Sequence, residues 1–509
     1  MRIASLHALP RVYRGAAVRA AERVAMDRFE LDEDDLMARA GLAAWRLLLD
    51  RWPQAHRIGI LCGPGNNGGD GYVLAELARA SGRHPFVLRL DDEIRTGAAQ
   101  RAADVYLQAG GEVARFESDD ALPQADVWVD ALFGIGLQRA LEGAAADAVS
   151  ALNHDNPAPI LALDVPSGVD ADSGDDHGLS VRATVTLTFI AGKPGLYTGA
   201  GRAAAGERVV DTLGLAEHVF DDLEPAARIA CAADLAHWFP PRRRDAHKGH
   251  FGHALCIGGD LGYGGALALC AEAAHRVGAG LVSAATRAEH VPVLLARRPE
   301  TMARAVDDAD ALRPMLDRAD VLAVGPGLGT GEWGAAMLYA ALESGKPAVF
   351  DADALNAIAR RDAETMPQAV LTPHPGEAAR LLGIATTDVE RDRLQSARRL
   401  IGRYGCATTL KGAGTVVAAP GEIPVIVDAG NPGMATGGMG DVLTGAVAGL
   451  LAQGASPFEA AVCASLLHAA AGDAAAHDGG GERGLLPSDL FPHLRRLSNP
   501  VPAGRTGRA

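Results

Sequence analysis

Asn431-Pro-Gly-Met-Ala-Thr-Gly-Gly-Met-Gly-Asp-Val-Leu-Thr-Gly445 is the stretch that decides how this sequence folds and what it can do. Its glycines leave backbone N–H groups free to point at an anion, and a helix that starts there adds partial positive charge. A carboxylate in this place can take a proton from a hydroxyl that then meets phosphate. The alternative is that Asp441 only caps the helix. The apolar residues that follow at helical spacing are Val442, Leu443, Ala446, Val447, Leu450 and Leu451.

The composition indicates a globular protein of several domains. A chain of 509 residues is too long for one ordinary domain, so about two to four are expected. The net charge of −15 disfavours a nucleic-acid surface but is compatible with a local basic pocket for a phosphorylated ligand. No segment has the pattern of a signal peptide or reaches membrane-spanning length, and the six cysteines form no C-x-x-C pair. We therefore expect a cytoplasmic protein with reduced thiols and with neither membrane nor nucleic-acid partners.

The N-terminal half shows the strand, loop and helix rhythm of an α/β domain. The glycine-rich loop satisfies G-x-G-x-x-G, but this match alone is weak. Pro64 and the pair Asn66-Asn67 do not belong to the usual dinucleotide loop, so we do not predict a redox Rossmann domain. The predicted elements are a helix over residues 31–51, a strand over 58–62, the glycine-rich loop over 63–71, a helix over 72–80, helices near 95–109 and 138–152, and strands over 127–129, 160–163 and 184–190.

Polar side chains follow three of these predicted strands. In an open parallel sheet the carboxyl ends of the strands meet at one edge, where ligands bind. A single acid there is usually a loop residue or a helix cap. Three clusters that converge on one edge predict a binding site. The clusters are Asn66, Asn67 and Asp70; Asp130; and Asp164 with Ser167.

A second α/β series follows a boundary that we place near residues 220–228. Six strand ends there carry glycine-rich or acidic loops, which indicates a large nucleotide-handling domain. No G-x-x-x-x-G-K-[ST] sequence is present, so the chain is not a P-loop protein. We predict domains over residues 1–222 and 228–497 and a disordered tail over 498–509. The six loops are 258–265, 325–329, 351–356, 372–377, 411–415 and the opening stretch.

These motifs, in this order, resemble the bifunctional NAD(P)H-hydrate repair enzymes. In that family an epimerase is fused to an ADP-dependent dehydratase. The resemblance extends over residues 57–445. It implies an α/β fold with an N-terminal Rossmann-like three-layer sandwich and a C-terminal ribokinase-like domain. The motifs that carry it are Gly63-Pro-Gly-Asn-Asn-Gly-Gly-Asp-Gly71, Asp164-Val-Pro-Ser-Gly168, Gly325-Pro-Gly-Leu-Gly329, Asp351-Ala-Asp-Ala-Leu-Asn356, Thr372-Pro-His-Pro-Gly-Glu377 and the opening stretch.

The resemblance also implies an activity. The family repairs NADH or NADPH that has taken up water on the nicotinamide ring. Its epimerase interconverts the R and S hydrates, NAD(P)HX, and its dehydratase removes water from the S form at the expense of ADP or ATP. Repair would begin when the base takes a proton from the ring hydroxyl, which then receives the terminal phosphoryl group; phosphate leaves afterwards.

For the N-terminal half, the resemblance implies a K⁺ site and a hydrate site. Oxygen ligands suit a hard cation. Asp164 is the candidate base, although it can instead cap the turn before Pro166. The positions that match the K⁺ ligands are Asn67, Asp130 and Ser167. The positions that match substrate contacts are Asn66, Asn67, Gly68, Gly69, Asp70, Gly134, Ile135, Gly136, Leu137, Gln138, Arg139, Ala140 and Asp164.

For the C-terminal half, the resemblance implies that Asp441 is the general base and contacts the hydrate. Lys411 would supply positive charge for phosphates. Asp351 and Asp353 are candidates to hold Mg²⁺ near those phosphates. The further hydrate-contacting positions are Ala266, Gly327 and His374, and the adenine-nucleotide positions are Lys411, Gly412, Ala413, Gly414, Thr415 and Gly440.

Two other interpretations remain at this point. A ribokinase-like small-molecule kinase with an N-terminal nucleotide-binding module would share the Gly-x-Gly-Asp motif. The N-terminal half can also be a sensing or partner-binding module without catalysis. The sequence does not decide between NADHX and NADPHX or between ADP and ATP. We expect a homo-oligomer.

Overall fold

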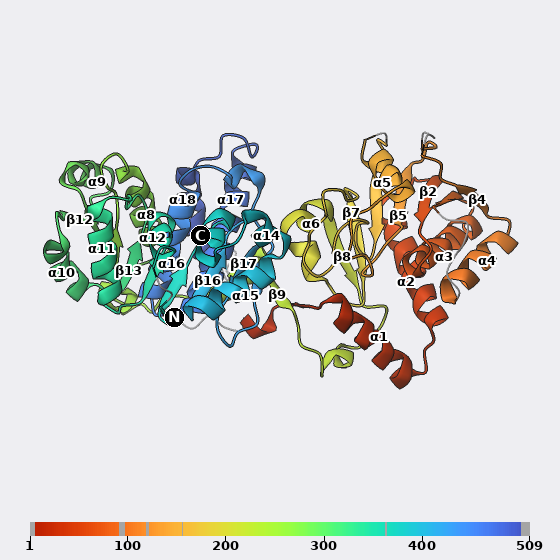
Figure 1. Ribbon diagram of the computed structural model, residues 1–509, viewed down its shortest axis with the longest axis horizontal. Coiled ribbons are helices and arrows are strands. Elements are labelled where there is room, and N and C mark those ends of the chain that lie inside the picture. The colour runs from red at the N-terminus through yellow and green to blue at the C-terminus, as the bar shows by residue number, and fades with distance from the viewer. Residues whose placement is uncertain (1–5, 91–96, 119–121, 155, 362–363, 500–509) are drawn as a thin grey trace, which may run out of the picture. The chain divides into compact units, whose positions relative to one another are not determined.

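The computed structural model describes residues 6–90, 97–118, 122–154, 156–361 and 364–499 (Figure 1). The chain divides into two compact units, one of Arg11–Ala227 and the other of Arg228 onward together with the first ten residues. The predicted N-terminal domain, residues 1–222, includes the segment before Arg11, whereas the structure groups this segment with the C-terminal unit. The reason is local, since the Arg228 guanidinium donates to the carbonyl oxygens of His7 and Leu9, at 2.6 and 2.9 Å.

The N-terminal unit contains one parallel sheet in the order β4-β3-β2-β5-β6-β7-β8. The order reverses at β2, so the loops after β2 and β5 flank a topological switch point, where such sheets bind ligands. The strands are β2 (Arg57–Cys62), β3 (His84–Arg89), β4 (Glu112–Arg115), β5 (Val127–Ala131), β6 (Ile160–Leu163), β7 (Val185–Phe189) and β8 (Glu207–Asp211). The helices are α1 (Gly15–Phe29), α2 (Glu33–Arg51), α3 (Asn66–Ala80), α4 (Ala98–Gln108), α5 (Ala144–His154) and α6 (Gly199–Ala204).

Helices cover both faces of this sheet, because alternate residues of each strand enter different hydrophobic clusters. Ile60 of β2 and Val129 of β5 pack with α3, whereas Leu61 and Trp128 pack with α5. The strands are consequently buried on both faces, as parallel strands usually are. The expected three-layer sandwich is confirmed.

The glycine-rich loop is shorter than predicted, because helix α3 begins at Asn66 rather than near residue 72. Gly65 is the N-cap residue, and Gly68 lies against the chain of the preceding turn. A Cβ added at Gly68 would be 1.9 Å from the carbonyl oxygen of Gly63. The glycines therefore allow a helix to start in close contact with β2, so the polar residues from Asn66 to Asp70 lie on the first helical turns.

The C-terminal unit contains a larger sheet in the order β9-β18-β17-β16-β15-β14-β13-β10-β11-β12. Its strands are parallel except for β17, which runs antiparallel to both neighbours. Four strands of this sheet, β9, β11, β12 and β17, were not predicted from the sequence. The strands are β9 (Ala227–Ala230), β10 (His253–Ile257), β11 (Leu281–Thr286), β12 (Met302–Ala305), β13 (Val321–Val324), β14 (Ala348–Phe350), β15 (Ala369–Leu371), β16 (Ala407–Leu410), β17 (Thr415–Ala418) and β18 (Val425–Val427).

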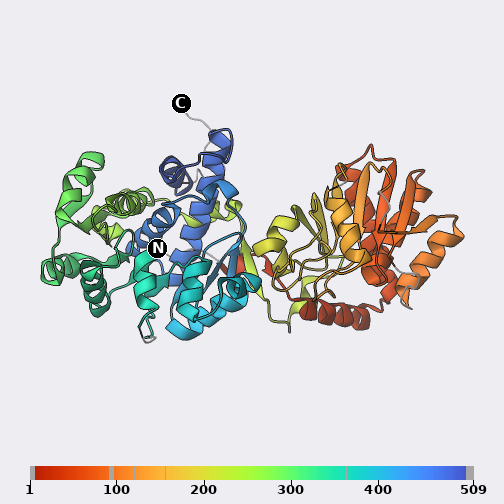
Figure 2. The ribbon, with the colours of Figure 1, turned by 45° about the horizontal axis from the view of Figure 1, so that its top comes forward.

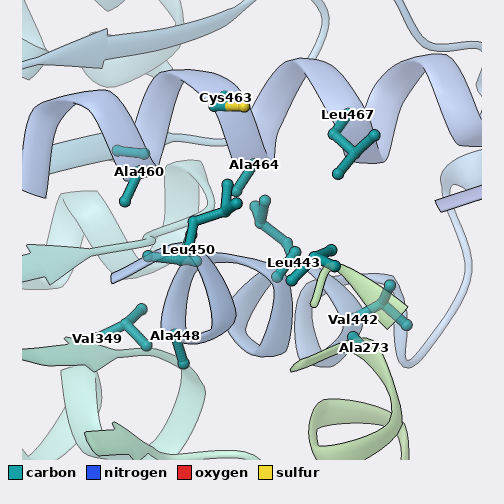
Figure 3. Close-up of a cluster of buried hydrophobic side chains, with 14 of the residues drawn as sticks. Ala273, Val349, Val442, Leu443, Ala448, Leu450, Ala460, Cys463, Ala464 and Leu467 are labelled. Atoms are coloured by element: carbon teal, nitrogen blue, oxygen red, sulfur yellow. The ribbon is translucent and has the colours of Figure 1, made fainter. Parts of the chain in front are cut away.

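The centre of this unit is the helix predicted from the opening stretch, α16 (Met439–Ala452), together with α17 (Pro457–Asp478). Both helices are apolar on almost every face, which is typical of buried helices. Figure 3 shows Leu443 and Leu450 of α16 facing Ala464 and Leu467 of α17, with Val349 of β14 on the other side of α16. Burying one such leucine side chain contributes about 1.5–3 kcal/mol. The packing fixes the position of the first turn of α16.

The remaining helices surround the sheet of this unit (Figure 2). They are α7 (Leu235–Trp238), α8 (Gly264–Arg276), α9 (Val291–Arg297), α10 (Ala309–Arg318), α11 (Glu332–Glu343), α12 (Ala352–Ile358), α13 (Pro375–Leu382), α14 (Thr386–Arg391), α15 (Arg393–Tyr404) and α18 (Leu490–Leu497). Ser498 still caps α18, and residues 500–509 of the predicted tail lie outside the described residues. Among the helices of the described segments, none is long and apolar enough to cross a membrane.

Candidate active sites

Asp441 is the third residue of α16, and it does not cap that helix. Gly438 is the N-cap residue, in a left-handed conformation with a φ of 94°, and no side chain makes a capping hydrogen bond there. The capping alternative for Asp441 is therefore wrong. Burial, reinforced by the nearby charge of Asp351, raises the pKa of the Asp441 carboxyl to about 7. A carboxyl group with this pKa can exchange a proton at neutral pH.

Lys411 and Asp351 form a buried ion pair beside the first turn of α16. The Lys411 Nζ lies 2.7 Å from Asp351 Oδ1 and 3.8 Å from Glu377 Oε2. The other oxygen of Asp351 accepts a hydrogen bond from the Thr444 hydroxyl at 2.7 Å. Thr444 also belongs to α16, so Asp351 ties the end of β14 to the helix that carries Asp441. Asp351 thus has a positioning role.

Gly440 allows the lysine to approach the helix. A Cβ at this position would be 3.2 Å from both Lys411 Nζ and Asp351 Oδ2. The first turn of α16 therefore brings three groups together: the Lys411 ammonium group, the N–H groups at the start of the helix and the Asp441 carboxyl. A phosphate group fits such a place, since both the lysine charge and the helix terminus favour an anion.

A buried arginine supports the loop that begins at Lys411. The Arg393 guanidinium donates to the carbonyl oxygens of Leu410 and Lys411, at 3.0 and 2.9 Å. Burial lowers the pKa of Arg393 to about 10. Gly412 has a φ of 141°, and a Cβ there would come within 2.8 Å of the guanidinium. The loop carries the predicted nucleotide positions, and Ala413 near its tip is exposed.

The further predicted hydrate-contacting residues of this half lie in the first turn of α8, where Ala266 is, and on the loops after β13 and β15, which carry Gly327 and His374. Gly327 has a φ of 61°, and a Cβ there would be 3.3 Å from the Cβ of Ala266. These two positions are therefore brought together. His374 caps α13 instead, where its Nδ1 accepts the N–H of Gly376 at 3.0 Å. The backbone carbonyl of Pro373 accepts from Lys411 N at 2.9 Å, so the His374 loop borders the lysine.

In the N-terminal unit, Asp130 and Ser167 are joined at the ends of β5 and β6. The Ser167 hydroxyl donates to Asp130 Oδ1 at 2.6 Å, and its backbone N–H donates to Oδ2 at 2.8 Å. Complete burial raises the pKa of Asp130 to about 6. An adjacent cation would stabilise the ionised carboxylate at this buried position.

Asn67, the third predicted K⁺ ligand, has a side chain that makes no hydrogen bond. Its side-chain oxygen and nitrogen are both buried and have no hydrogen-bond partner. Burying an amide without a hydrogen-bond partner costs free energy of folding, and a ligand bound to its oxygen would offset that cost. The β2 and β5 loops are in contact, since Gly63 N donates to the Ala131 carbonyl at 3.0 Å. The donor set of Asn67, Asp130 and Ser167 contains oxygen atoms only and fits an alkali cation.

Asp164 is held by a lysine that the sequence analysis missed. Lys193 is fully buried and donates to Asp164 Oδ1 at 2.6 Å, to the Thr188 hydroxyl at 2.8 Å and to the Phe189 carbonyl at 2.7 Å. The other carboxylate oxygen accepts from Ile135 N at 3.1 Å, in the predicted substrate loop. Asp164 also has a φ of 64°, an uncommon backbone conformation for a residue with a side chain.

A compositional signal for Lys193 was available in the sequence. Only four of the chain's 48 basic residues are lysines, and two of them, Lys193 and Lys411, directly follow a strand or its connecting turn. The other two are Lys248 and Lys346. In a chain that otherwise uses arginine, a lysine in such a place indicates a compact charge in a confined site.

Two further acids, Asp70 and Glu22, lie close enough to Asp164 for its negative charge to raise their pKa values. Burial, with added repulsion from Asp164 and Glu22, raises the pKa of Asp70 well above its usual range. Burial and the charge of Asp164 also raise the pKa of Glu22. The raised pKa of Asp70 favours its protonated form, while Lys193 holds the Asp164 carboxylate in an ion pair. An acid and a base can work together at such a place, because one carboxyl is buried and the other is paired with a cation.

Among the other predicted substrate positions of this half, Gly134 lies next to the Asp164 carboxylate, whereas several later residues of the same loop are exposed to solvent. A Cβ at Gly134 would be 2.6 Å from Asp164 Oδ2, so the loop passes directly over the carboxylate. Gly136, Gln138, Arg139 and Ala140 are exposed.

Asp351 and Asp353, the candidates to hold Mg²⁺, already have hydrogen-bond partners. Both oxygens of Asp351 already have partners, and Asp353 Oδ2 accepts from Gly329 N at 2.9 Å. Among the residues that the structure describes, no cluster of three or more His, Cys, Asp or Glu side chains is arranged to hold a metal ion. An Mg²⁺ ion at this place would therefore need phosphate oxygens among its ligands.

Comparisons with known proteins match both halves of the chain. A family model described as NAD(P)H-hydrate dehydratase matches residues 254–496, and one described as YjeF-related protein N-terminus matches residues 33–195. The bifunctional NAD(P)H-hydrate repair enzyme Nnr of Coxiella burnetii is 46% identical over 96% of this chain and 99% of its own length. The Escherichia coli protein of the same name is 44% identical over 95% of this chain and 93% of its own length.

Solved structures match the C-terminal half. The ADP/ATP-dependent NAD(P)H-hydrate dehydratase from Bacillus subtilis, co-crystallised with ATP and Mg²⁺, is 28% identical and covers 53% of this chain and 97% of its own, with a TM-score of 0.48. A ribokinase-like superfamily protein from Enterococcus faecalis is 31% identical and covers 53% of this chain and 94% of its own, with a TM-score of 0.49.

Proposed function

The chain belongs to the family of bifunctional NAD(P)H-hydrate repair enzymes, and we propose that its two units divide the two reactions between them. The protein is an NAD(P)H-hydrate epimerase and dehydratase. The N-terminal unit interconverts the R and S hydrates, and the C-terminal unit returns the S hydrate to NAD(P)H. A simple small-molecule kinase is disfavoured, because the relatives match both halves over nearly the full length of each chain.

One observation carries the assignment of the dehydratase chemistry. Asp441 is a half-buried carboxyl group with a pKa of about 7, no capping hydrogen bond and the start of α16 beside it. The family's reaction needs a base that meets both a hydroxyl and a phosphate. Asp441 combines these properties with the neighbouring charge of Lys411.

The proposed dehydration uses ADP as phosphoryl donor. Asp441 takes the proton of the ring hydroxyl, and the hydroxyl oxygen receives the terminal phosphoryl group of ADP, which leaves AMP. Phosphate then departs with that oxygen, and the ring loses a proton to restore the dihydronicotinamide double bond. Lys411 and the N–H groups at the start of α16 stabilise the charge on the transferred group.

The proposed epimerisation uses Asp164 and Asp70. Inversion at the carbon that carries the hydroxyl can proceed by ring opening. The hydroxyl loses its proton and becomes a carbonyl as the bond from this carbon to the ring nitrogen breaks, and the nitrogen side takes up a proton; both transfers reverse when the bond forms again on the other face. Asp164 accepts the proton of the hydroxyl, and Asp70 can donate one. Lys193 is a positioning residue, because its ammonium group holds the Asp164 carboxylate in a buried ion pair.

The metal and nucleotide assignments follow from the donors present. K⁺ would be bound by Asn67, Asp130 and Ser167, where it supplies positive charge next to the hydrate site. Mg²⁺ would bind together with the nucleotide phosphates, which would supply ligands that Asp351 and Asp353 alone do not. Cytoplasmic location and homo-oligomeric assembly remain predictions.

A single spectroscopic experiment tests this function. The full chain is incubated with a mixture of R and S hydrates, K⁺, Mg²⁺ and ADP, and the absorbance of the reduced nicotinamide is followed. Complete recovery of both epimers is expected, with AMP and phosphate formed in proportion. A stable phosphorylated product would indicate a kinase. Recovery that stops when the S form is consumed would remove the epimerase assignment.

Replacing Asp130 with Ala should weaken K⁺ dependence and slow epimerisation, while dehydration of the pure S hydrate continues. The variant removes the carboxylate that Ser167 holds between β5 and β6. Epimerase rates are measured across a K⁺ series, with a Na⁺ series of equal ionic strength as control. An unchanged K⁺ requirement in the variant would contradict the assignment, as would Zn²⁺ found at these residues.

A further inference from the structure

A second anion site is indicated in the C-terminal unit, far from Asp441. A cavity of about 810 Å³ opens between the ends of α8, α16 and α18. This volume lies in the range of small-molecule sites, about 300–1,000 Å³. The C-cap residue of α16, Gln453, lines it, whereas Asp441 is in the first turn of the same helix. Twelve residues of helix place the two about 18 Å apart.

The cavity is cationic in a protein that is acidic overall. Two glutamates, Glu272 and Glu300, line it together with a larger set of arginines. Glu272 is shared by Arg276 and Arg298, so one carboxylate serves two cations of the lining. The arginines are Arg242, Arg243, Arg276, Arg298 and Arg495. An excess of positive charge in a chain of net charge −15 favours an anionic ligand.

Arg242 is already oriented toward this cavity by its neighbours. Its guanidinium lies 3.7 Å from the centre of the Phe251 ring and donates to the Gly278 carbonyl at 2.6 Å and to Gln453 Oε1 at 3.0 Å. In the part of the chain that the structure describes, neither Arg242 nor Arg495 has a carboxylate partner within ion-pair distance. A preorganised guanidinium without an acid is suited to phosphate.

Part of the remaining lining is apolar. Phe239, Pro240, Pro241 and Phe251 contribute to it. We infer that the cavity binds a small ligand carrying two or more phosphate groups, at a site distinct from the dehydratase centre. Two sources share this chemistry: inorganic diphosphate, which uses the arginines alone, and a nucleoside diphosphate, whose base would also contact the apolar residues.

The inference is tested by calorimetric titration of the full chain with pyrophosphate. The pair of variants R242E and R495E is combined in one protein, since both side chains are exposed and lie outside the proposed catalytic groups. We expect the double variant to lose one class of pyrophosphate sites, or to bind there at least tenfold more weakly. ADP-dependent dehydration at saturating hydrate should stay within about twofold of the parent.

A matched control separates a local site from a general charge effect. R304E combined with R313E makes the same change in net charge at exposed positions on β12 and α10. This control should bind pyrophosphate as the parent does. Equal losses in the two double variants, or no loss in either, would overturn the inference. Because binding is measured directly, the result does not depend on whether the chain dehydrates NAD(P)HX.

A second titration identifies the source of the phosphate groups. Uridine diphosphate shares the diphosphate but carries a base other than adenine. If uridine diphosphate binds at least fivefold more tightly than pyrophosphate, and this difference disappears in R242E/R495E, the cavity is a nucleotide site. Equal affinities assign it to inorganic diphosphate. Failure of both probes to bind there would refute the site.

Discussion

Replacing Asp441 with Asn should lower the turnover number for dehydration of the S hydrate by about 10²–10⁴-fold, the usual contribution of a general base. Asparagine keeps the size of the side chain but accepts no proton. ADP should still bind, because Lys411 and the loop supported by Arg393 are unchanged. Turnover is measured with the pure S hydrate, and nucleotide affinity is measured separately by calorimetry.

The structural alternative for Asp441 predicts a different result. If its charge only complements the start of α16, the substitution costs about 0.3–1 kcal/mol of stability and leaves turnover nearly normal. Epimerase activity of the same sample, which belongs to the other unit, controls for enzyme concentration. A variant within about threefold of the parent, less than ~1 kcal/mol in barrier, would remove Asp441 from the catalytic groups.

The pH profile of the parent gives an independent readout. Burial and the charge of Asp351 raise the pKa of Asp441 to about 7, and only the ionised form acts as a base. As pH falls below about 7, the ratio kcat/KM for dehydration should therefore decrease about tenfold per pH unit. A profile that stays flat down to pH 5 would contradict the role of Asp441.

The positions of the sites could be predicted because the sequence pattern identifies where the buried strands end. Buried parallel strands are short apolar runs, and the residues after them must lie at one edge of the sheet. Asp130 and Ser167 illustrate this, since they are 37 positions apart in the chain and hydrogen-bonded in the structure. The first turn of α16 was predicted on the same basis, from glycines followed by a helical apolar pattern.

The supporting interactions were not predictable in the same way. Lys193 is 29 residues from Asp164, and no local pattern says that a buried lysine will donate to that carboxylate. The start of α3 was missed because glycine and asparagine usually disfavour a helix, whereas close contact with β2 makes Gly68 necessary. Strand β17 was missed because it starts at Thr415, which the sequence analysis assigned to the loop over 411–415.

Replacing Asp164 with Asn should lower epimerisation by about 10²–10⁴-fold for the same reason as at Asp441. The environment differs, however, because Lys193 is buried and would lose its charged partner. Leaving one member of a buried ion pair alone costs about 3–5 kcal/mol, enough to unfold a marginal domain. Loss of activity in this variant alone therefore does not separate catalysis from folding.

A second substitution resolves the ambiguity. Lys193→Met replaces the ammonium group with an apolar side chain of similar length, so the double variant D164N/K193M contains neither buried charge. We expect the double variant to recover the thermal stability of the N-terminal unit while epimerisation stays at least 10²-fold below the parent, since Asn accepts no proton. If epimerisation in the double variant instead returns to within about threefold of the parent, less than ~1 kcal/mol in barrier, Asp164 serves only to neutralise Lys193.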